Sequence, residues 1–411
     1  MSAYASALSG LLANSTALEV VGDNLANINT QGFKSDSVLF EDAMNAANAS
    51  LQAGEGVSST QTSRNFTQGS IQTTNGPLDA AIQGSGFFVV QNSAGAIQYT
   101  RDGSFSLDAN GNLVTSAGDL VQGWTAVNGV LNASGATSAI SIPALTSLAP
   151  TATQNMTMTA NLDATAPTGT TFSTPIQVVD SLGNTQTLTV TYTETAANTW
   201  SYNVTIPGED VTGGKVGTPQ SLATGTLQFD SSGNLTSPAS GKPIALKTSG
   251  TLADGAAVLN INWNLYDSNN NPLITQYAEA SASSGTTQDG VQPGTPTGVT
   301  LQNGGELVAS YSNGKQVTIA QVAVASIANP DSMIAVTGNN YTLGTDTLTP
   351  SVGAAGTGNR GNIVGGSLES SNVDMATEFT NLIVFQRGYE ASSKVITTQN
   401  QMDQTLLAIT L

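Results

Sequence analysis

The chain has 411 residues, of which 9% are charged, and 28 acidic groups against 10 basic ones give a net charge of −18. This length allows two to four domains, and the acidic balance without basic runs makes nucleic acid and anionic membranes poor partners. Neither cysteine nor histidine is present, which excludes disulfides, thiolate or imidazole metal ligands, and Ser-His or Cys-His nucleophiles. Catalysis would have to depend on carboxylates, Lys, Tyr or a Ser-Lys pair. We therefore expect neither an enzyme nor a cofactor or metal.

The first predicted element is an amphipathic helix over residues 3 to about 28. Its larger apolar residues follow alternating steps of three and four, with Ser15 and Gly22 at the remaining positions and Ser2 as a candidate N-cap. Such a heptad pattern is typical of helices that pair with other helices. The stripe consists of Tyr4, Leu8, Leu11, Leu18 and Leu25.

The stretch "NLANINTQGFKSD", residues 24 to 36, ends this helix. Asn24, Asn27 and Asn29 are weak helix formers, and Gly32 is a natural C-terminal stop. The chain then continues through Phe33 and the apolar residues 38 to 40, so we predict an extended segment after the helix.

The middle of the chain predicts an all-β architecture. Short runs rich in β-branched and aromatic residues are bounded by Gly, Pro, Asn and Asp, which is the pattern of strands and hairpins. The clearest are "GFFVV", "TLTVTYTE", "TWSYNVTI", "VLNINWNLY" and "VTIAQVAVASI".

One turn motif recurs between these runs, at Asp108 to Asn112, Asp180 to Asn184 and Asp230 to Asn234. In each, we expect Asp to cap its own turn and Gly to supply a positive φ. The alternative is a calcium loop, but the glutamate that should close such a loop is absent each time.

Two changes in composition suggest an inserted domain. Residues 144 to 154 and 281 to 298 are rich in Ser, Thr, Pro and Gly, and they bracket β-rich sequence. We therefore expect three nested domains: residues 1–70 with 365–411 as a helical coiled-coil domain, 71–150 with 286–364 as a β-rich body, and 151–285 as an inserted β domain.

The last element mirrors the first. Ser371 to Asp374 matches a Ser-x-x-Asp helix start, and Met375, Leu382, Tyr389 and Ile396 recur every seven residues, with Phe379, Met402 and Leu406 widening the stripe. No proline follows, so about 38 residues of helix would span roughly 57 Å. The mid-helix Gly388 costs about 1 kcal/mol relative to Ala, which would be explained by a neighbouring backbone that approaches there, and a tolerated surface glycine is the alternative.

A helix this long favours a coiled-coil interpretation in which the two ends of the chain pair. The pair would still leave Leu12, Val21, Ile383 and Phe385 facing outward. These faces dock either on the rest of the chain or on other copies, and we favour other copies.

The two ends also carry a family resemblance. "SGLLANSTALEVVGDNLANINTQGFKSD" at 9 to 36 and "GGSLESSNVDMATEFTNLIVFQRGYEASSKVITTQNQMDQTL" at 365 to 406 resemble the paired terminal signatures of bacterial flagellar rod and hook proteins. "LDAAIQGSGFFVV", "YTRDGSFSLDANGNLV" and "YSNGKQVTIAQVAVASIANP" are similar to the body domain of that family. The inserted "IQVVDSLGNTQTLTVTYTE", "WSYNV" and "GTLQFDSSGNL" resemble the outer domain of its hook members, which the shorter rod members lack.

The resemblance implies a homopolymer, a hollow curved tube that transmits torque from rod to filament and surrounds an export channel. It also implies contacts with a distal rod protein, a hook cap protein, a hook-filament junction protein and the flagellar type III export apparatus. The alternatives are a distal rod protein forming a straight, stiff tube and a β-rich surface adhesin, and a carboxylate hydrolase would need one acidic pair that the sequence does not single out.

Subunit contacts are expected from both stripes and from the loop after the first helix. The expected contact residues are Tyr4, Leu8, Leu11, Leu18, Leu25, Asn27, Asn29, Thr30, Gly32, Phe33, Met375, Phe379, Leu382, Gln386, Tyr389, Ile396, Met402 and Leu406.

Composition and the resemblance each bear on the location of the protein. No segment approaches the roughly 20 apolar residues of a membrane span, and the first 33 residues lack the Lys or Arg of a secretory signal. These signs alone indicate a cytoplasmic protein, although a chain without thiols suits export in an unfolded state. With the resemblance, we expect an extracellular flagellar protein, exported without a cleaved signal peptide and not inserted in a membrane.

Overall fold

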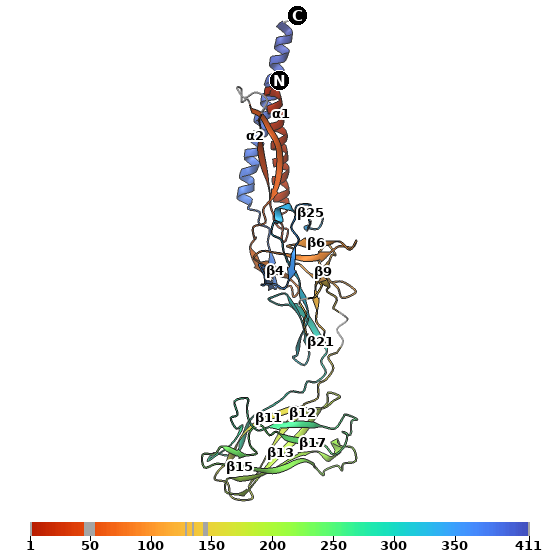
Figure 1. The fold of residues 1–411 in the computed structure, drawn as a ribbon, viewed down its shortest axis with the longest axis vertical. Helices are drawn as coiled ribbons and strands as arrows, with labels where there is room; N and C mark the ends of the chain where they lie inside the picture. Colours follow the sequence, from red (N-terminus) through yellow and green to blue (C-terminus); the bar gives the residue numbers. More distant parts are fainter. Residues whose placement is uncertain (1, 45–53, 128–129, 134, 143–146, 410–411) are drawn as a thin grey trace. The chain divides into compact units, whose positions relative to one another are not determined.

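The computed structural model describes residues 2–44, 54–127, 130–133, 135–142 and 147–409. The chain forms two compact units. The first consists of residues 1–145, 298–310 and 316–411, and the second of residues 146–297 and 311–315. In the described ranges most regular structure is strand, and the α-helices lie at the two ends of the chain (Figure 1). The prediction of a mostly β chain with long terminal helices is confirmed.

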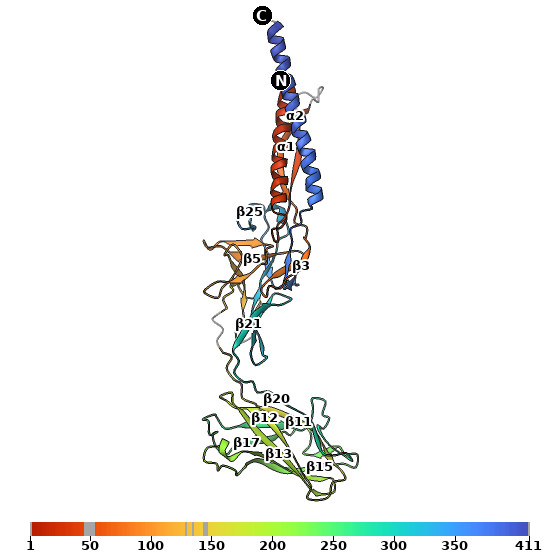
Figure 2. The same ribbon diagram turned by 180° about the vertical axis from the view of Figure 1, so that it is seen from behind.

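The terminal helices of the first unit pack against each other. Helix α1 spans Ser2–Ala26 and α2 spans Met375–Ile409, and they run side by side in both views (Figures 1 and 2). Strands β1 (Asp36–Met44) and β2 (Gly54–Arg64) pair antiparallel and also contact α1. The extended segment predicted after the first helix is thus β1. The candidate N-cap Ser2 has a side chain outside the described part of the structure.

The rest of the first unit is a β body. Its main sheet follows the order β21-β22-β23-β9-β5-β6-β26-β25, with β7, β8, β10, β24 and β27 paired to it. Two small pairs, β28 with β4 and β29 with β3, connect the body to the segment that leads into α2. The elements are β3 (Ile71–Thr73), β4 (Ala80–Gln83), β5 (Phe87–Gln91), β6 (Ile97–Thr100), β7 (Ser106–Leu107), β8 (Leu113–Val114), β9 (Leu120–Thr125), β10 (Ser138–Ala139), β21 (Pro296–Leu301), β22 (Glu306–Tyr311), β23 (Gln316–Val322), β24 (Val324–Ser326), the 3₁₀ turn η2 (Pro330–Ser332), β25 (Ile334–Val336), β26 (Asn340–Thr342), β27 (Ser351–Gly353), β28 (Asn362–Gly365) and β29 (Ser367–Glu369).

The second unit contains two sheets that share one core. One sheet has the order β17-β18-β11-β19, with β20 on the other side of β11, and the second has the order β12-β13-β14-β15-β16. The elements are β11 (Asn155–Asp163), β12 (Thr171–Val179), β13 (Thr185–Ala196), β14 (Thr199–Ile206), the 3₁₀ turn η1 (Gly208–Asp210), β15 (Gln220–Phe229), β16 (Leu235–Ser237), β17 (Ile244–Lys247), β18 (Asn260–Asn264), β19 (Ile274–Tyr277) and β20 (Ala282–Gln288).

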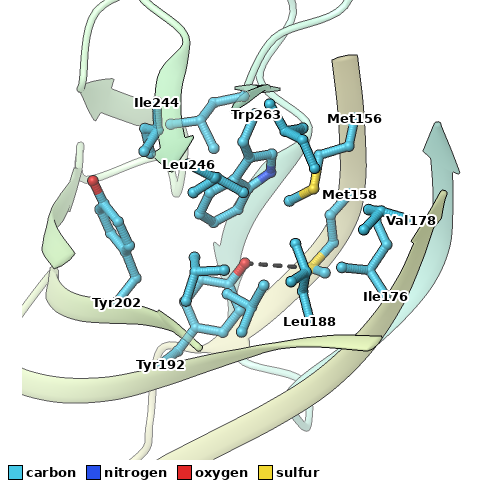
Figure 3. Packing of buried hydrophobic residues seen from close by; sticks show 14 of the residues in the cluster. Met156, Met158, Ile176, Val178, Leu188, Tyr192, Tyr202, Ile244, Leu246 and Trp263 are labelled. Atoms are coloured by element: carbon cyan, nitrogen blue, oxygen red, sulfur yellow. Dashed lines mark hydrogen bonds between the residues drawn. The ribbon is translucent and has the colours of Figure 1, made fainter. Parts of the chain in front are cut away.

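Strict alternation builds this core. Along β13 and β14 the residues alternate, so one face of the sheet is buried and apolar except for Gln186 and Glu194 near the ends of β13, and the other carries mostly Thr, Ser and Asn. Tyr192 and Trp263 come from opposite sheets and pack edge to face at 6.4 Å between ring centroids (Figure 3). The Tyr192 hydroxyl donates a hydrogen bond to Met158 Sδ at 3.4 Å.

Two features of the β prediction need correction. The run "VTIAQVAVASI" is two strands, because the ladder breaks at Ala323, whose amide bonds Gln122 O on β9 while β24 pairs with β27 and β5. The Ser/Thr-rich stretch 281 to 298, predicted to bracket the β-rich sequence, itself contains a strand, since residues 282–288 form β20, which pairs antiparallel with β11. Ser and Thr suit an exposed edge strand, so composition alone does not separate such a strand from a linker.

The recurrent Asp turns are confirmed. Asp108, Asp180 and Asp230 each accept two backbone amides on Oδ1, from the residues two and four positions later. The glycine three positions after each Asp has a φ between 80° and 92°. A further turn of the same kind at Asp267 was missed, because Asn270, with φ 62°, stands where the other three have Gly.

Candidate assembly interface

The seam between α1 and α2 is antiparallel and has one register. A Cβ built on Gly10 would lie 3.3 Å from Ser392 Oγ, and one on Gly388 would lie 2.6 Å from Asn14 Oδ1. At the lower end of α1, Asn24 Nδ2 donates to Glu378 Oε1 at 3.1 Å. Each pair has the same sum of residue numbers, so one continuous register runs from Gly10 to Asn24 of α1.

The two heptad stripes predicted from the sequence, on α1 and on α2, are together called the leucine stripe. On both helices the seam lies one residue away from this stripe. On α1 it follows Gly10, Asn14, Ala17, Val21 and Asn24, each directly before a residue of the predicted pattern. On α2 it includes Ser392 as well as Glu378 and Gly388, and the last two again stand directly before predicted positions. A shift of one residue turns a helix face by about 100°, so the leucine stripe does not form the intramolecular seam.

The reason is steric. Small side chains let two helix axes approach closely. A Cβ on Gly388 would collide with the Asn14 side chain, and one on Gly10 would be a tight fit against Ser392. Gly388 does have a close neighbour, but it is the Asn14 side chain and not the backbone that was predicted. The larger residues are therefore displaced to the flank of the pair, where periodicity alone had placed the seam.

The stripe residues themselves are exposed or partly buried. On α1, Tyr4 and Leu8 are 45% and 40% exposed, and Leu11, Leu18 and Leu25 are partly buried. On α2, exposed positions alternate with the partly buried Leu382 and Ile396, and the exposed ones are Met375, Phe379, Gln386, Tyr389, Met402 and Leu406.

The hairpin β1–β2 covers part of the surface expected to face outward. Val21 lies in the seam and is 3% exposed, so its predicted outward position is wrong. Phe385 is half-buried and lies 5.9 Å from Phe40 of β1 between ring centroids. Leu12 and Ile383 do face outward, as predicted. The chain's own hairpin thus satisfies one face, and the leucine stripe stays open.

Helix α2 begins later than predicted. The Asp374 carboxylate accepts the Thr377 amide at 2.7 Å and caps the first turn, so Ser371 is not the cap. Ser371 to Val373 run along the junction instead, where Asn372 accepts the Ser35 amide and donates to Asn65 O. At its far end, the seam register carries residues after about 400 beyond the first turn of α1, and both views show this extension (Figures 1 and 2).

The loop after α1 places three of its predicted subunit-contact residues at a cavity. Asn27, Thr30 and Phe33 line a cavity of about 690 Å³, together with Arg64 and residues 335–341 of the β25–β26 hairpin. Asn29 is exposed. Gly32 is buried with φ 67°, and a Cβ there would lie 2.5 Å from the Arg101 carbonyl carbon, so its role is internal packing.

A buried ion cluster fixes the junction between helices and body. Lys34 Nζ lies 2.6 Å from Glu369 Oε1, and Arg101 Nη1 lies 3.0 Å from Glu369 Oε2. The Gly69 amide also donates to Glu369 Oε1, and Lys34 donates to Thr67 O. Burial lowers the pKa of both Lys34 and Arg101, and Glu369 opposes this effect. The cluster joins three distant parts of the sequence.

Sequence reasoning missed this cluster. Lys34 has 0% side-chain exposure, although a lysine in a polar string is usually solvated. Asn24 was read as a weak helix residue, yet it exchanges two hydrogen bonds with the Asp36 backbone and a third with Glu378. The sequence did contain a signal. In a chain with so few positive charges, a single Lys in a polar stretch indicates a specific contact.

Comparisons with protein-family models show the class of protein to which the chain belongs. The model described as "Flagella basal body rod protein" matches residues 5–34, and "Flagellar basal body rod FlgEFG protein C-terminal" matches 364–409. "Flagellar hook protein FlgE/F/G D1 domain" matches 81–161, and "Flagellar basal body protein FlaE D2 domain" matches 147–291. These are the building blocks of structural proteins of the flagellar rod and hook.

Full-length relatives narrow this class. Flagellar hook protein FlgE of Escherichia coli strain K12 is 32% identical over 418 residues, covering 98% of this chain and 99% of its own length. That of Rhizobium meliloti strain 1021 is 33% identical over 411 residues, covering 97% of both. A solved Helicobacter pylori hook protein FlgE2 aligns at TM-score 0.49 and 15% identity over 66% of this chain and 93% of its own. The chain belongs to the flagellar hook protein FlgE family.

The family is a structural one of the flagellar hook and basal body, which agrees with the expectation of a structural rather than an enzymatic protein. Among the described residues, neither terminal helix is long and apolar enough to span a membrane.

Proposed function

We propose that copies of this chain assemble into a hollow, curved helical tube that joins rod to filament as a universal joint and encloses the export channel. The open leucine stripe beside the α1–α2 seam is the observation that supports this most directly. The seam satisfies the small residues of both helices within one molecule, whereas the large apolar residues beside it have no comparable cover.

The exposed apolar side chains supply the driving force. Burying a half-exposed Leu, Met or Phe contributes about 1 kcal/mol, and both helices carry several of them. An interface made from such helices would repeat around an axis, since α1 of one copy meeting α2 of the next is a heterologous contact that continues without closing on itself. The subunit contacts of the predicted stripe and loop residues, apart from the internally packed Gly32, belong to this proposal.

Bending is assigned to the β-rich parts. Their solvent-facing strand positions are mostly Thr, Ser, Asn and Gln, which are short, neutral side chains. Contacts between such surfaces change little in energy as they slide, whereas charged, interlocked contacts resist sliding. The division into a helical domain (1–70 with 365–411), a body (71–150 with 286–364) and an outer domain (151–285) is part of the same proposal.

The family suggests the remaining partners and the location. The tube would contact a distal rod protein, a hook cap protein and a hook-filament junction protein, and the chain would reach it through the flagellar type III export apparatus without a cleaved signal peptide. The terminal helices, too weakly covered in one copy, would become fully ordered on assembly.

Electron microscopy of the concentrated full-length chain tests this function. We expect curved tubes with a central channel. Straight, stiff tubes would favour a distal rod protein, and a chain that stays monomeric at every concentration would contradict assembly and favour a surface adhesin. Deleting residues 1–30 should leave a soluble β-rich monomer that forms no tubes.

A further inference from the structure

Resting on the proposed assembly, we propose that Glu19 of one copy forms ion pairs with Arg387 and Lys394 on α2 of a neighbouring copy, and that these pairs set the register of the inter-copy helix contact. The starting observation is the position of Glu19. It is exposed and directly follows Leu18, at the edge of the leucine stripe and on the same line as the exposed Leu12.

An interface that covers this stripe also removes water from the Glu19 carboxylate. If Leu12 and Leu18 become buried against another helix, Glu19 loses much of its water, and an unpaired charge in an apolar contact is strongly unfavourable. In the described structure no ion pair involves Glu19. A partner helix that fits this surface must therefore bring a cation.

Few basic residues of the chain are free to pair with Glu19. Of its 10 basic residues, Lys34, Arg64 and Arg101 are held in ion pairs, and Arg360 donates to Ala354 O and to its neighbours on the body. Four lysines lie in the second compact unit, namely Lys215, Lys242, Lys247 and Lys315. Arg387 and Lys394 remain, and both are on α2.

These two residues lie together on one exposed side of α2, away from its own stripe, and the exposed Val384 and Val395 lie beside them. Both are exposed, and neither takes part in an ion pair in the described ranges. They are one heptad apart, about 10.5 Å along the helix, so a carboxylate between them is within reach of both long side chains. Glu390 lies between them on α2 and no ion pair joins it to either, so this surface keeps a positive balance.

Charge also explains why the pairing should be specific. Copies with a net charge of −18 repel one another, and the terminal helices carry no other positive groups than these two. Pairing them with an anion of the next copy offsets repulsion at the point of contact, and it disfavours α1 against α1, which would bring like charges together. The contact is then heterologous and gives the polymer a direction.

Charge reversal in the full-length chain tests the inference. We expect Glu19→Lys, and separately Arg387→Glu with Lys394→Glu, to raise the lowest concentration that forms tubes about tenfold, and the three changes combined to restore it to within about threefold of wild type. Sedimentation at about 50 mM salt is the measurement. Glu279→Lys, the same change at an exposed position of the second unit, is the control and should have no effect.

The outcomes separate this inference from the proposed function. If wild type forms tubes and Glu19→Lys behaves like Glu279→Lys, or if the combined variant is no better than the α2 variant alone, the ion pairs are refuted while assembly stands. If the wild-type chain forms no tubes, both fail. Far-UV circular dichroism of the monomers checks that every variant keeps its helices.

Discussion

Lys34 Nζ and Glu369 Oε1 lie 2.6 Å apart, and neither side chain is accessible to solvent. They are separated by 335 residues, so this contact closes the junction between the two ends of the chain. Arg101 completes the cluster from the β body. A single carboxylate thus compensates two buried cations.

This imbalance predicts unequal losses of stability. Glu369→Gln leaves two buried cations without an anion and should cost about 3 to 5 kcal/mol in the free energy of unfolding. Lys34→Met leaves the Arg101–Glu369 pair intact and should cost about 1 to 2 kcal/mol. Urea unfolding followed by the helical dichroism signal compares them, and a larger loss for Lys34→Met would contradict the arrangement.

The seam predicts coupling between Asn14 and Gly388. Gly388→Ala alone gains about 1 kcal/mol of helix propensity but places a methyl group 2.6 Å from Asn14 Oδ1, so the net effect should be near zero or destabilising. Adding Asn14→Ala removes the obstruction. The double variant should therefore be about 1 kcal/mol more stable than the sum of the two single changes in the free energy of unfolding predicts. Thermal melting gives the double-mutant cycle, and additive effects would mean that the helices do not meet here.

The open stripe predicts a loss of assembly without a loss of fold. Leu8→Gln with Leu18→Gln should leave the helical signal of the monomer unchanged and raise the concentration needed for tubes at least about tenfold. Leu107→Gln with Leu182→Gln, at exposed leucines away from the helices, serves as the matched control. Ala17→Leu at the seam should do the opposite and lower the melting temperature of the monomer. Normal assembly of the stripe variant would contradict the proposed interface.

Glu378 predicts a pH dependence. It is buried at the seam, and burial raises the pKa of its carboxyl above the ordinary value. The folded chain then binds this proton more tightly than the unfolded chain, so this group lowers stability as pH rises from about 4.5 through its folded pKa. Glu378→Gln keeps the acceptor for Asn24 and removes the charge, and it should be more stable than wild type at pH 7 but not at pH 4.

The measurement is the difference in the free energy of unfolding between this variant and wild type at each pH. Taking the difference cancels the many carboxylates that both chains share, including the turn aspartates whose pKa is lowered by amide donors. A difference that stays constant from pH 4 to 7 would contradict a raised pKa of the Glu378 carboxyl.

Several features could be read from the sequence because they depend on local chemistry. Alternation of apolar residues predicted β13 and β14, and the Asp-Gly spacing predicted three turns, since the pleat and a positive φ impose these patterns within a few residues. The terminal helices and their pairing followed from heptad spacing. The missed turn at Asp267 shows the limit, because Asn270 takes the role of Gly without the same signal.

The face on which the helices pair was decided only by tertiary structure. Periodicity finds the face with the largest apolar side chains, but the closest approach of two backbones is set by the smallest ones, and so the seam at Gly10, Asn14 and Gly388 lies one residue from the stripe. The Lys34–Glu369 contact was likewise out of reach, since the stability of a buried charge depends on what the fold brings to it from several hundred residues away.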